Sequence, residues 1–180
     1  MKKFPSFPLL LIALVLCCCC SNKSDSGMLH IKGSIDSRFN GYSVYFRPQP
    51  YPTEDIVVES EIKDGKFEFH IPADSVYIAD VMLSRSAHGD IEKLLLVAEP
   101  GELEMCLDRT SRSSGTPLND TLQSWKDFIV NNIQTMKMAQ IDQAQRLFEE
   151  RTVTLIKNNM NPLGGYIFML NNSTFSQRNI

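Results

Sequence analysis

Apolar and polar residues alternate in short stretches over the first half of the chain. A period of two is typical of half-buried β-strands, because successive side chains point to opposite faces of a sheet. Leu29 to Ile35 shows this alternation most clearly. Asp64-Gly65, between two such stretches, predicts a tight hairpin turn, since primed turns need positive φ. The predicted strands are residues 29–35, 42–46, 56–62, 66–71, 76–83, 91–97 and 102–108.

The pattern becomes helical near residue 117. Residues 109–117 are rich in Ser, Thr, Arg and Gly and predict a loop. Apolar residues then recur every three or four positions, which places them on one helix face. A first stripe runs from Leu118 to Met136 and a second from Ile141 to Ile156, and Asn161-Pro162 predicts the start of a short last helix. The segment 119–121, which matches a glycosylation acceptor sequence, is interpreted as a helix start.

These elements together predict an α+β fold. We expect an antiparallel β-sandwich or open barrel of about seven strands, followed by a C-terminal helical extension. The expected divisions are a lipoprotein signal peptide and lipobox over residues 1–19, a tether over 20–27, a β-rich domain over 28–109, and a linker with a helical segment over 110–180. The length that remains after the signal suits one domain of ordinary size.

The first twenty residues have the layout of a bacterial lipoprotein signal. Two lysines precede a short apolar run, and four cysteines, Cys17 to Cys20, follow it at once. The run is about half as long as the roughly 20 apolar residues that a membrane-spanning helix needs, so we expect it to be cleaved. The tetrapeptide from Leu16 to Cys19 resembles a lipobox, whose cysteine receives a diacylglycerol, and Cys18 and Cys20 are the alternatives. The sequence therefore predicts a lipid-anchored protein of the bacterial cell envelope, in the inner or the outer membrane.

Charge narrows the choice of partners. The signal holds two of the 18 Lys and Arg and none of the 21 Asp and Glu, which leaves a formal charge of −5 on the mature chain. No basic stripe interleaved with aromatic residues is present, so nucleic acid is not expected as a partner. Multiple acyl chains anchor a protein stably. We therefore expect the lipid, and not charge, to attach this acidic body to the membrane.

Titratable residues that could carry chemistry are scattered along the sequence. Cys106 is the one cysteine outside the signal, and its strand places it on a face with Glu104 and Asp108, whose carboxylates disfavour the reactive thiolate. His30 and His70 are predicted to face solvent, and the third histidine lies in a turn. No histidine pair has zinc-site spacing, and no phosphate-binding glycine loop or nucleophile elbow occurs. We therefore predict no catalytic residue, no metal site and no cofactor.

Aromatic residues gather beside a proline-rich loop. Tyr42, Tyr45, Phe46 and Tyr51 lie close to the prolines at positions 48, 50 and 52. Exposed aromatic side chains suit contact with sugars or partner proteins, so this cluster would make a binding edge if it were exposed. Aromatic residues at this spacing more often form the core and rim of a sandwich, which is the interpretation we favour.

Four short motifs occur in the same order as in a known family. They are Leu29 to Ile35, Val58 to Phe69, Glu99 to Leu103 and Gly115 to Asn119. The set resembles the uncharacterised β-rich domain that precedes a thioredoxin-like domain in many Gram-negative envelope lipoproteins, and it covers roughly residues 28–125. Residues 161–166 look like the segment that connects the two domains in those relatives. Because the chain ends at residue 180 without a thioredoxin-like fold, and has no Cys-x-x-Cys outside the signal, we do not expect their redox activity here.

The sequence thus favours a non-catalytic, lipid-anchored envelope protein that acts through binding or assembly. One alternative is a glycan- or small-ligand-binding module that uses the aromatic edge. Another is a truncated or auxiliary relative of a thiol–disulfide oxidoreductase that works with a separate thioredoxin-like partner. Phe168, Met169 and Leu170 would lack the cover that a following domain gives in the relatives. We therefore expect self-association or capture of another envelope protein through residues after Asn161.

Overall fold

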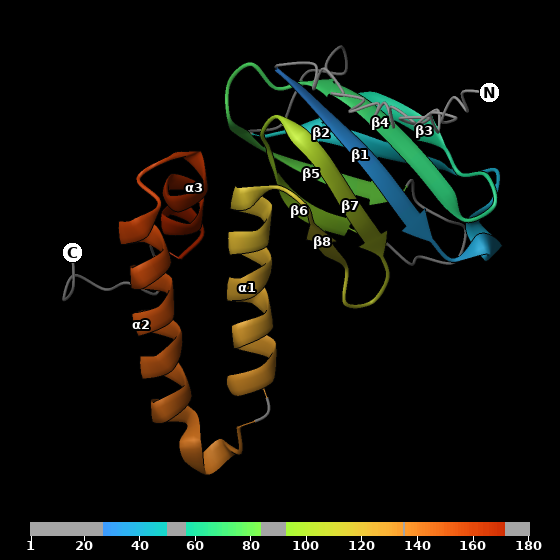
Figure 1. Ribbon diagram of the computed structural model, residues 1–180. Coiled ribbons are helices and arrows are strands. Elements are labelled where there is room, and N and C mark those ends of the chain that lie inside the picture. The colour runs from blue at the N-terminus through green and yellow to red at the C-terminus, as the bar shows by residue number, and fades with distance from the viewer. Residues whose placement is uncertain (1–26, 50–56, 84–92, 135, 172–180) are drawn as a thin grey trace, which may run out of the picture.

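The computed structural model describes residues 27–49, 57–83, 93–134 and 136–171. Within these ranges the chain forms eight strands and then three α-helices (Figure 1). The strands are β1 (Met28–Ile35), β2 (Ser43–Pro48), β3 (Val58–Glu61), β4 (Lys66–Pro72), β5 (Tyr77–Leu83), β6 (Lys93–Ala98), β7 (Gly101–Leu107) and β8 (Arg112–Ser114). The helices are α1 (Pro117–Asn132), α2 (Ile141–Asn158) and α3 (Pro162–Asn171), and the short 3-10 turn η3 (Met138–Gln140) precedes α2.

The strands make two sheets that pack face to face. One sheet has the order β4-β1-β7-β8 and the other β3-β2-β5-β6. Alternate side chains of both sheets point into the space between them, so that Phe46 of β2 and Phe69 of β4 lie with ring centroids 6.1 Å apart across the core. The structure confirms the α+β sandwich with a helical extension. One pair, β1 with β7, runs parallel, and the other strand pairs are antiparallel.

Strand β8 lies in the segment that was predicted to be a loop. Its three residues pair with β7, with Met105 opposite Ser113. A strand this short has no alternation of apolar and polar residues to detect. Its backbone is extended because β7 offers it a free edge, which is a tertiary cause that the local sequence does not reveal.

The turn at Asp64-Gly65 is confirmed, but the predicted hairpin ladder is wrong. Both residues have positive φ, 52° and 69°, and the backbone groups of Lys63 and Lys66 bond across the turn at 2.9 Å. The flanking strands nevertheless separate, since β3 pairs with β2 in one sheet and β4 pairs with β1 in the other. Ile62 is the point of divergence, because its backbone bonds to Gly41 and Tyr42 while its side chain enters the core.

The helices cover part of the outer face of the second sheet. Ile78 of β5 and Val97 of β6 point away from the sandwich core and pack against Leu122 of α1, Leu155 of α2, and Leu163 and Ile167 of α3. Beyond Leu122 the side chains of α1 are half-buried or exposed, and the helix ends at Asn132. Met136, which was assigned to the first helical stripe, lies in the connection to α2. Among the described helices, none is both long enough and apolar enough to cross a bilayer.

Candidate ligand-binding groove

Several predicted sites fall outside the described residues. These are the lipidation position Cys19 with its alternatives Cys18 and Cys20, the turn histidine His88, and Tyr51 of the aromatic edge. Their chemistry stays a prediction. The site is therefore built from residues of the two sheets and the helices.

Cys106 lies on the outer face of the first sheet, half-buried between Glu104 and Asp108 on β7 and the turn that follows it. Its Sγ donates to a carboxylate oxygen of Asp108 at 3.6 Å. The structure thus places the thiol beside a negative charge, as the alternation predicted.

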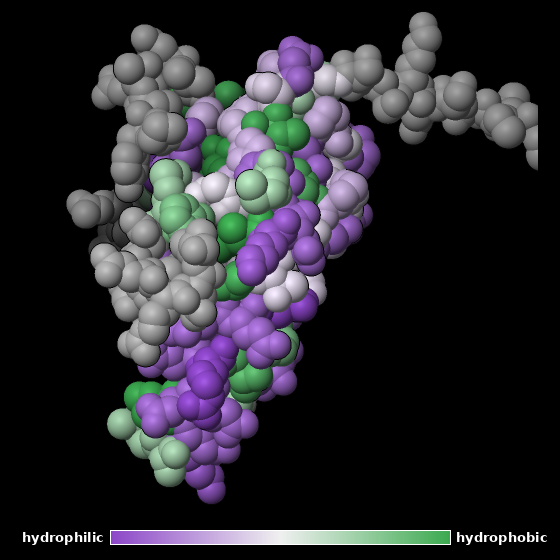
Figure 2. All heavy atoms as spheres, turned by 90° about the vertical axis from the view of Figure 1, so that its left-hand side faces the viewer, coloured by the Kyte–Doolittle hydropathy of each residue, from purple (hydrophilic) through white to green (hydrophobic). Residues whose placement is uncertain are grey.

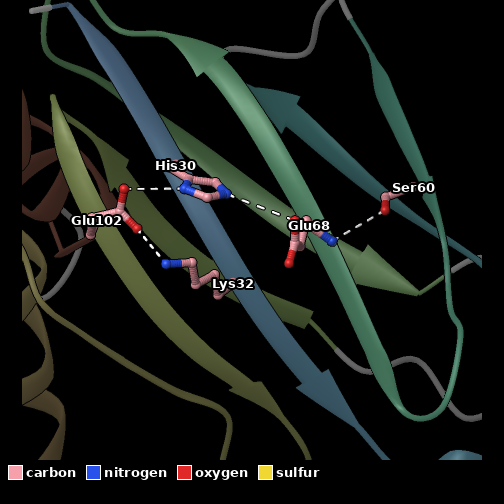
Figure 3. Close-up of polar contacts among 5 residues, drawn as sticks. All are labelled: His30, Lys32, Ser60, Glu68 and Glu102. Atoms are coloured by element: carbon pink, nitrogen blue, oxygen red, sulfur yellow. Dashed lines mark hydrogen bonds and ion pairs between the residues drawn. The ribbon is translucent and has the colours of Figure 1, made fainter. Parts of the chain in front are cut away.

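His30 and His70 each point outward from the first sheet, as their alternation with apolar residues predicted. The β1–β4 register places them side by side, and their rings stack with centroids 4.1 Å apart. Figure 3 shows His30 between two carboxylates, with Nδ1 3.1 Å from Glu102 and Nε2 3.9 Å from Glu68. Lys32 Nζ lies 2.8 Å from the second oxygen of Glu102, and together with His30 it lowers the pKa of that carboxyl group. The described residues contain no group of three or more His, Cys, Asp and Glu that could hold a metal ion. The sequence did not indicate this stacking, because it depends on the β1–β4 register.

The predicted aromatic edge is only partly exposed. Phe46 is buried in the core, and Tyr42 is half-buried with its ring edge-on to Phe39. Tyr45 is also half-buried. The favoured interpretation was that these aromatic residues form the core and rim of the sandwich, and the burial of Phe46 confirms it for this residue.

Two of the family-like motifs meet in a junction that fastens α1 to the sandwich. Glu99, which is buried after β6, accepts hydrogen bonds from the backbone N–H groups of Leu118 and Asn119 at 2.7 and 3.2 Å. Asn119 is fully buried, and its side chain accepts from Val97 N and donates to Val97 O and Thr116 Oγ1. The carboxylate thus caps the first turn of α1, and the amide covers the free edge of β6.

The junction fixes α1 beside β6 and β8 (Figure 1). A groove of about 570 Å³ lies between α1, β6 and the β7–β8 turn. Its apolar wall is formed by Leu95 of β6, Trp125, Ile129 and Val130 of α1, and Phe148 of α2. Trp125 is held by a hydrogen bond from Nε1 to Thr152 Oγ1 at 3.1 Å and by Phe148, whose ring centroid lies 6.3 Å away. This volume lies within the range of small-molecule sites, about 300–1,000 Å³.

Lys126 brings a positive charge into the groove from α1. Its Nζ is partly buried and donates to the carbonyl oxygen of Ser111 at 3.5 Å. Burial, together with the positive charge of Arg112 on β8, lowers the pKa of Lys126 to about 8, although Asp127 acts in the opposite direction. The site thus contains an amine whose positive charge its surroundings do not fully compensate.

Lys93 stands at the β6 side of the groove and pairs with a buried carboxylate. Its Nζ lies 3.0 Å from Asp80 Oδ2, and Arg47 and Gln49 donate to the same carboxylate at 2.9 and 2.8 Å. Burial alone would raise the pKa of Asp80, but the hydrogen bonds and charges of Arg47 and Lys93 hold it below its ordinary value. This ion cluster positions Lys93 beside the groove.

The β7–β8 turn forms the opposite rim and is ordered by Asp108. One carboxylate oxygen accepts from both the backbone N–H and the hydroxyl of Thr110, at 2.7 and 2.8 Å, and these bonds lower the pKa of Asp108. Ser111 Oγ closes the turn on Asp108 O. Arg109 projects from this rim and is exposed. The groove thus combines basic groups at its edge with an apolar wall, an arrangement suited to binding and one that no motif in the sequence indicated.

The comparisons agree with this architecture. Among curated proteins none matches the chain. The family described as domain of unknown function DUF4369 matches residues 29–122, which span both sheets and the first turns of α1. This range agrees with the resemblance found over roughly residues 28–125, and it includes the junction of Glu99 with Asn119. The chain therefore belongs to the DUF4369 family.

Proposed function

We propose that the protein is a non-catalytic, lipid-anchored component of the bacterial cell envelope that acts by binding, and that the groove between α1, β6 and the β7–β8 turn holds its ligand. The observation that carries this proposal is the groove itself, in which Lys126 and Lys93 stand beside an apolar wall. Partly buried cations and exposed apolar surface are unfavourable when left uncovered. A bound ligand would relieve both.

Membrane attachment is tested by removing the cysteines. Serine at positions 17 to 20 is expected to move the protein from the membrane fraction to the soluble fraction, because the apolar run is too short to anchor it after cleavage. Fractionation and mass spectrometry of the N-terminus measure this. Cys106→Ser is the matched control and should leave the protein in the membrane. A quadruple variant that stays in the membrane with its signal removed would contradict the lipid anchor.

Assembly is a second candidate, favoured by exposed apolar side chains on the last helix. Met169 and Leu170 are 68% and 56% exposed, whereas Leu163 and Ile167 of the same helix are fully buried. Figure 2 shows further apolar atoms at the tip of the α1–α2 hairpin, where Met138 and Ile141 are exposed. Self-association would cover such residues. If the surface instead binds another protein, the family resemblance implies that this partner is a separate thioredoxin-like protein.

Assembly through α3 is tested by point substitutions, because truncation at Met160 would also remove the buried Leu163 and Ile167. Met169→Ser with Leu170→Ser is expected to abolish the cross-linked species while leaving the thermal midpoint nearly unchanged, since both side chains are mostly exposed. Val58→Ser, an exposed apolar position on β3, is the control. A protein whose sedimentation and cross-links are the same before and after the double substitution would rule out this surface.

Glycan binding is the remaining alternative, and a hollow between the helices supports it better than the aromatic edge does. A second hollow of about 520 Å³ lies between α1 and α2, lined by Trp125 together with polar side chains that include Asp120, Ser124, Arg151 and Asn158. An aromatic ring beside planar polar groups suits a sugar. Trp125 thus lines both hollows, and one optical signal can report on either ligand.

A further inference from the structure

We propose that the groove takes a small amphiphilic anion, with its anionic headgroup beside Lys126 and Lys93 and its apolar body against Trp125, Ile129 and Phe148. This inference rests on the proposed function and names the chemical class of its ligand. The headgroup is a carboxylate or a phosphate, and the body is an alkyl or acyl chain.

The headgroup position follows from the hydrogen-bonding capacity of Lys126. An ammonium group has three N–H donors, and Ser111 O at 3.5 Å accepts one of them through a long bond. The Nζ of Lys93 forms an ion pair with Asp80, and the side chain is 46% exposed. Lys93 can therefore also contact an anionic group bound in the groove. Arg109 adds a third positive charge at the rim. Among the residues that line the groove, Asp108 is the acidic one, and its carboxylate is engaged by Thr110.

The apolar body follows from the opposite wall. Trp125, Ile129 and Phe148 are each half-buried, although they lie on the helix faces that the sequence marked as apolar stripes. These side chains therefore still expose apolar surface that a ligand can cover, at roughly 25 cal/mol per Å² of area removed from water. A groove of about 570 Å³ has room for a small ligand but not for a folded partner.

The charge of Lys126 predicts a pH dependence. The groups that face it are Arg112 from β8, Asp127 from its own helix, and Lys93, Asp108 and Arg109 around the groove. The pKa of Lys126 is about 8 in the free protein, and a bound anion would raise it. Binding therefore takes up a proton above pH 8. Affinity should be full well below that pH and should fall as the pH rises above it.

The test uses the fluorescence of Trp125, the single tryptophan of the chain, in the full chain with serine at positions 17 to 20. Titration with decanoate or with decyl phosphate, below their critical micelle concentrations, should change this fluorescence along a saturating binding curve. The ligand that binds more tightly identifies the preferred headgroup. The uncharged match, 1-decanol, should bind at least tenfold more weakly. Binding is read in solution and membrane attachment in cell fractions, so failure of one is distinguishable from failure of the other.

Substitutions distinguish binding in the groove from nonspecific hydrophobic binding elsewhere on the protein. Lys126→Met should lower the affinity for decanoate at least tenfold. Lys126→Arg should bind decanoate with an affinity within about threefold of that of the unmodified protein. Its affinity should no longer depend on pH in this range, because the guanidinium group stays charged. Lys157→Met, at an exposed lysine on α2, should change nothing. Equal thermal midpoints of the lysine variants establish that folding is intact. The proposal is overturned if Lys126→Met binds normally, if decanol binds as well as decanoate, or if a neutral oligosaccharide such as chitotriose changes the fluorescence and the anions do not.

Discussion

Replacing Asn119 with alanine is expected to lower the free energy of unfolding by about 4 kcal/mol, since a buried polar group left unpaired costs about 1–3 kcal/mol. The Asn119 side chain makes three hydrogen bonds, at 2.7 to 2.9 Å, and is fully buried. Alanine would leave both backbone polar groups of Val97 without a partner in a place that water does not reach. The start of α1 would also lose its direct attachment to β6 and would keep only the backbone hydrogen bonds to Glu99.

Chemical denaturation followed by circular dichroism measures this loss. Asn132→Ala is the matched control, because Asn132 lies on the same helix and bonds Phe128 O at an exposed site. We expect the control to change stability by less than about 1 kcal/mol. Equal effects of the two substitutions would show that the junction does not fasten the helix to the sheet.

Gly115→Ala is expected to destabilise the fold by about 3 kcal/mol, from backbone strain and a forced shift of the neighbouring strand. Gly115 has a φ of 119°, a conformation that residues with a side chain rarely adopt. A Cβ atom there would also lie 2.5 Å from the carbonyl oxygen of Glu102 on β7. Since this contact is with backbone, a change of rotamer cannot relieve it.

Gly165→Ala on α3 serves as the control for Gly115→Ala. A Cβ atom at Gly165 meets nothing within 4 Å, and alanine favours helix by about 1 kcal/mol over glycine. Thermal unfolding should therefore show a lower midpoint for Gly115→Ala and an unchanged or higher one for Gly165→Ala. A Gly115→Ala protein as stable as the parent would mean that the β8–α1 connection adapts, and that the junction is less rigid than its contacts imply.

Local patterns were sufficient for most of the strands and helices. Alternation placed Phe67, Phe69 and Ile71 of β4 in the core, because side chains on a strand change face at every residue whatever the partner strand is. Asn161-Pro162 marked the start of α3, where Asn161 Oδ1 accepts from the N–H of Leu163 at 3.0 Å. Such features depend on neighbours in sequence, and the sequence contains them.

The pairing of strands was not determined locally. Asp64-Gly65 makes the tight turn that its residue types require, yet β3 and β4 join different sheets. The choice depends on which distant strand each one meets, and the turn says nothing about this. The same holds for β8, which is extended because β7 lies beside it.

By itself the sequence determined the fold class, the order of most elements and the resemblance to a family of β-rich lipoprotein domains, and it predicted the lipid anchor. Only the tertiary structure decided the candidate site. Lys93, Asp108 and Lys126 are far apart along the chain and belong to no motif, so nothing local connects them. They meet because Glu99 and Asn119 fasten α1 to β6, and the lowered pKa of Lys126 exists only once that packing excludes water and brings Arg112 near.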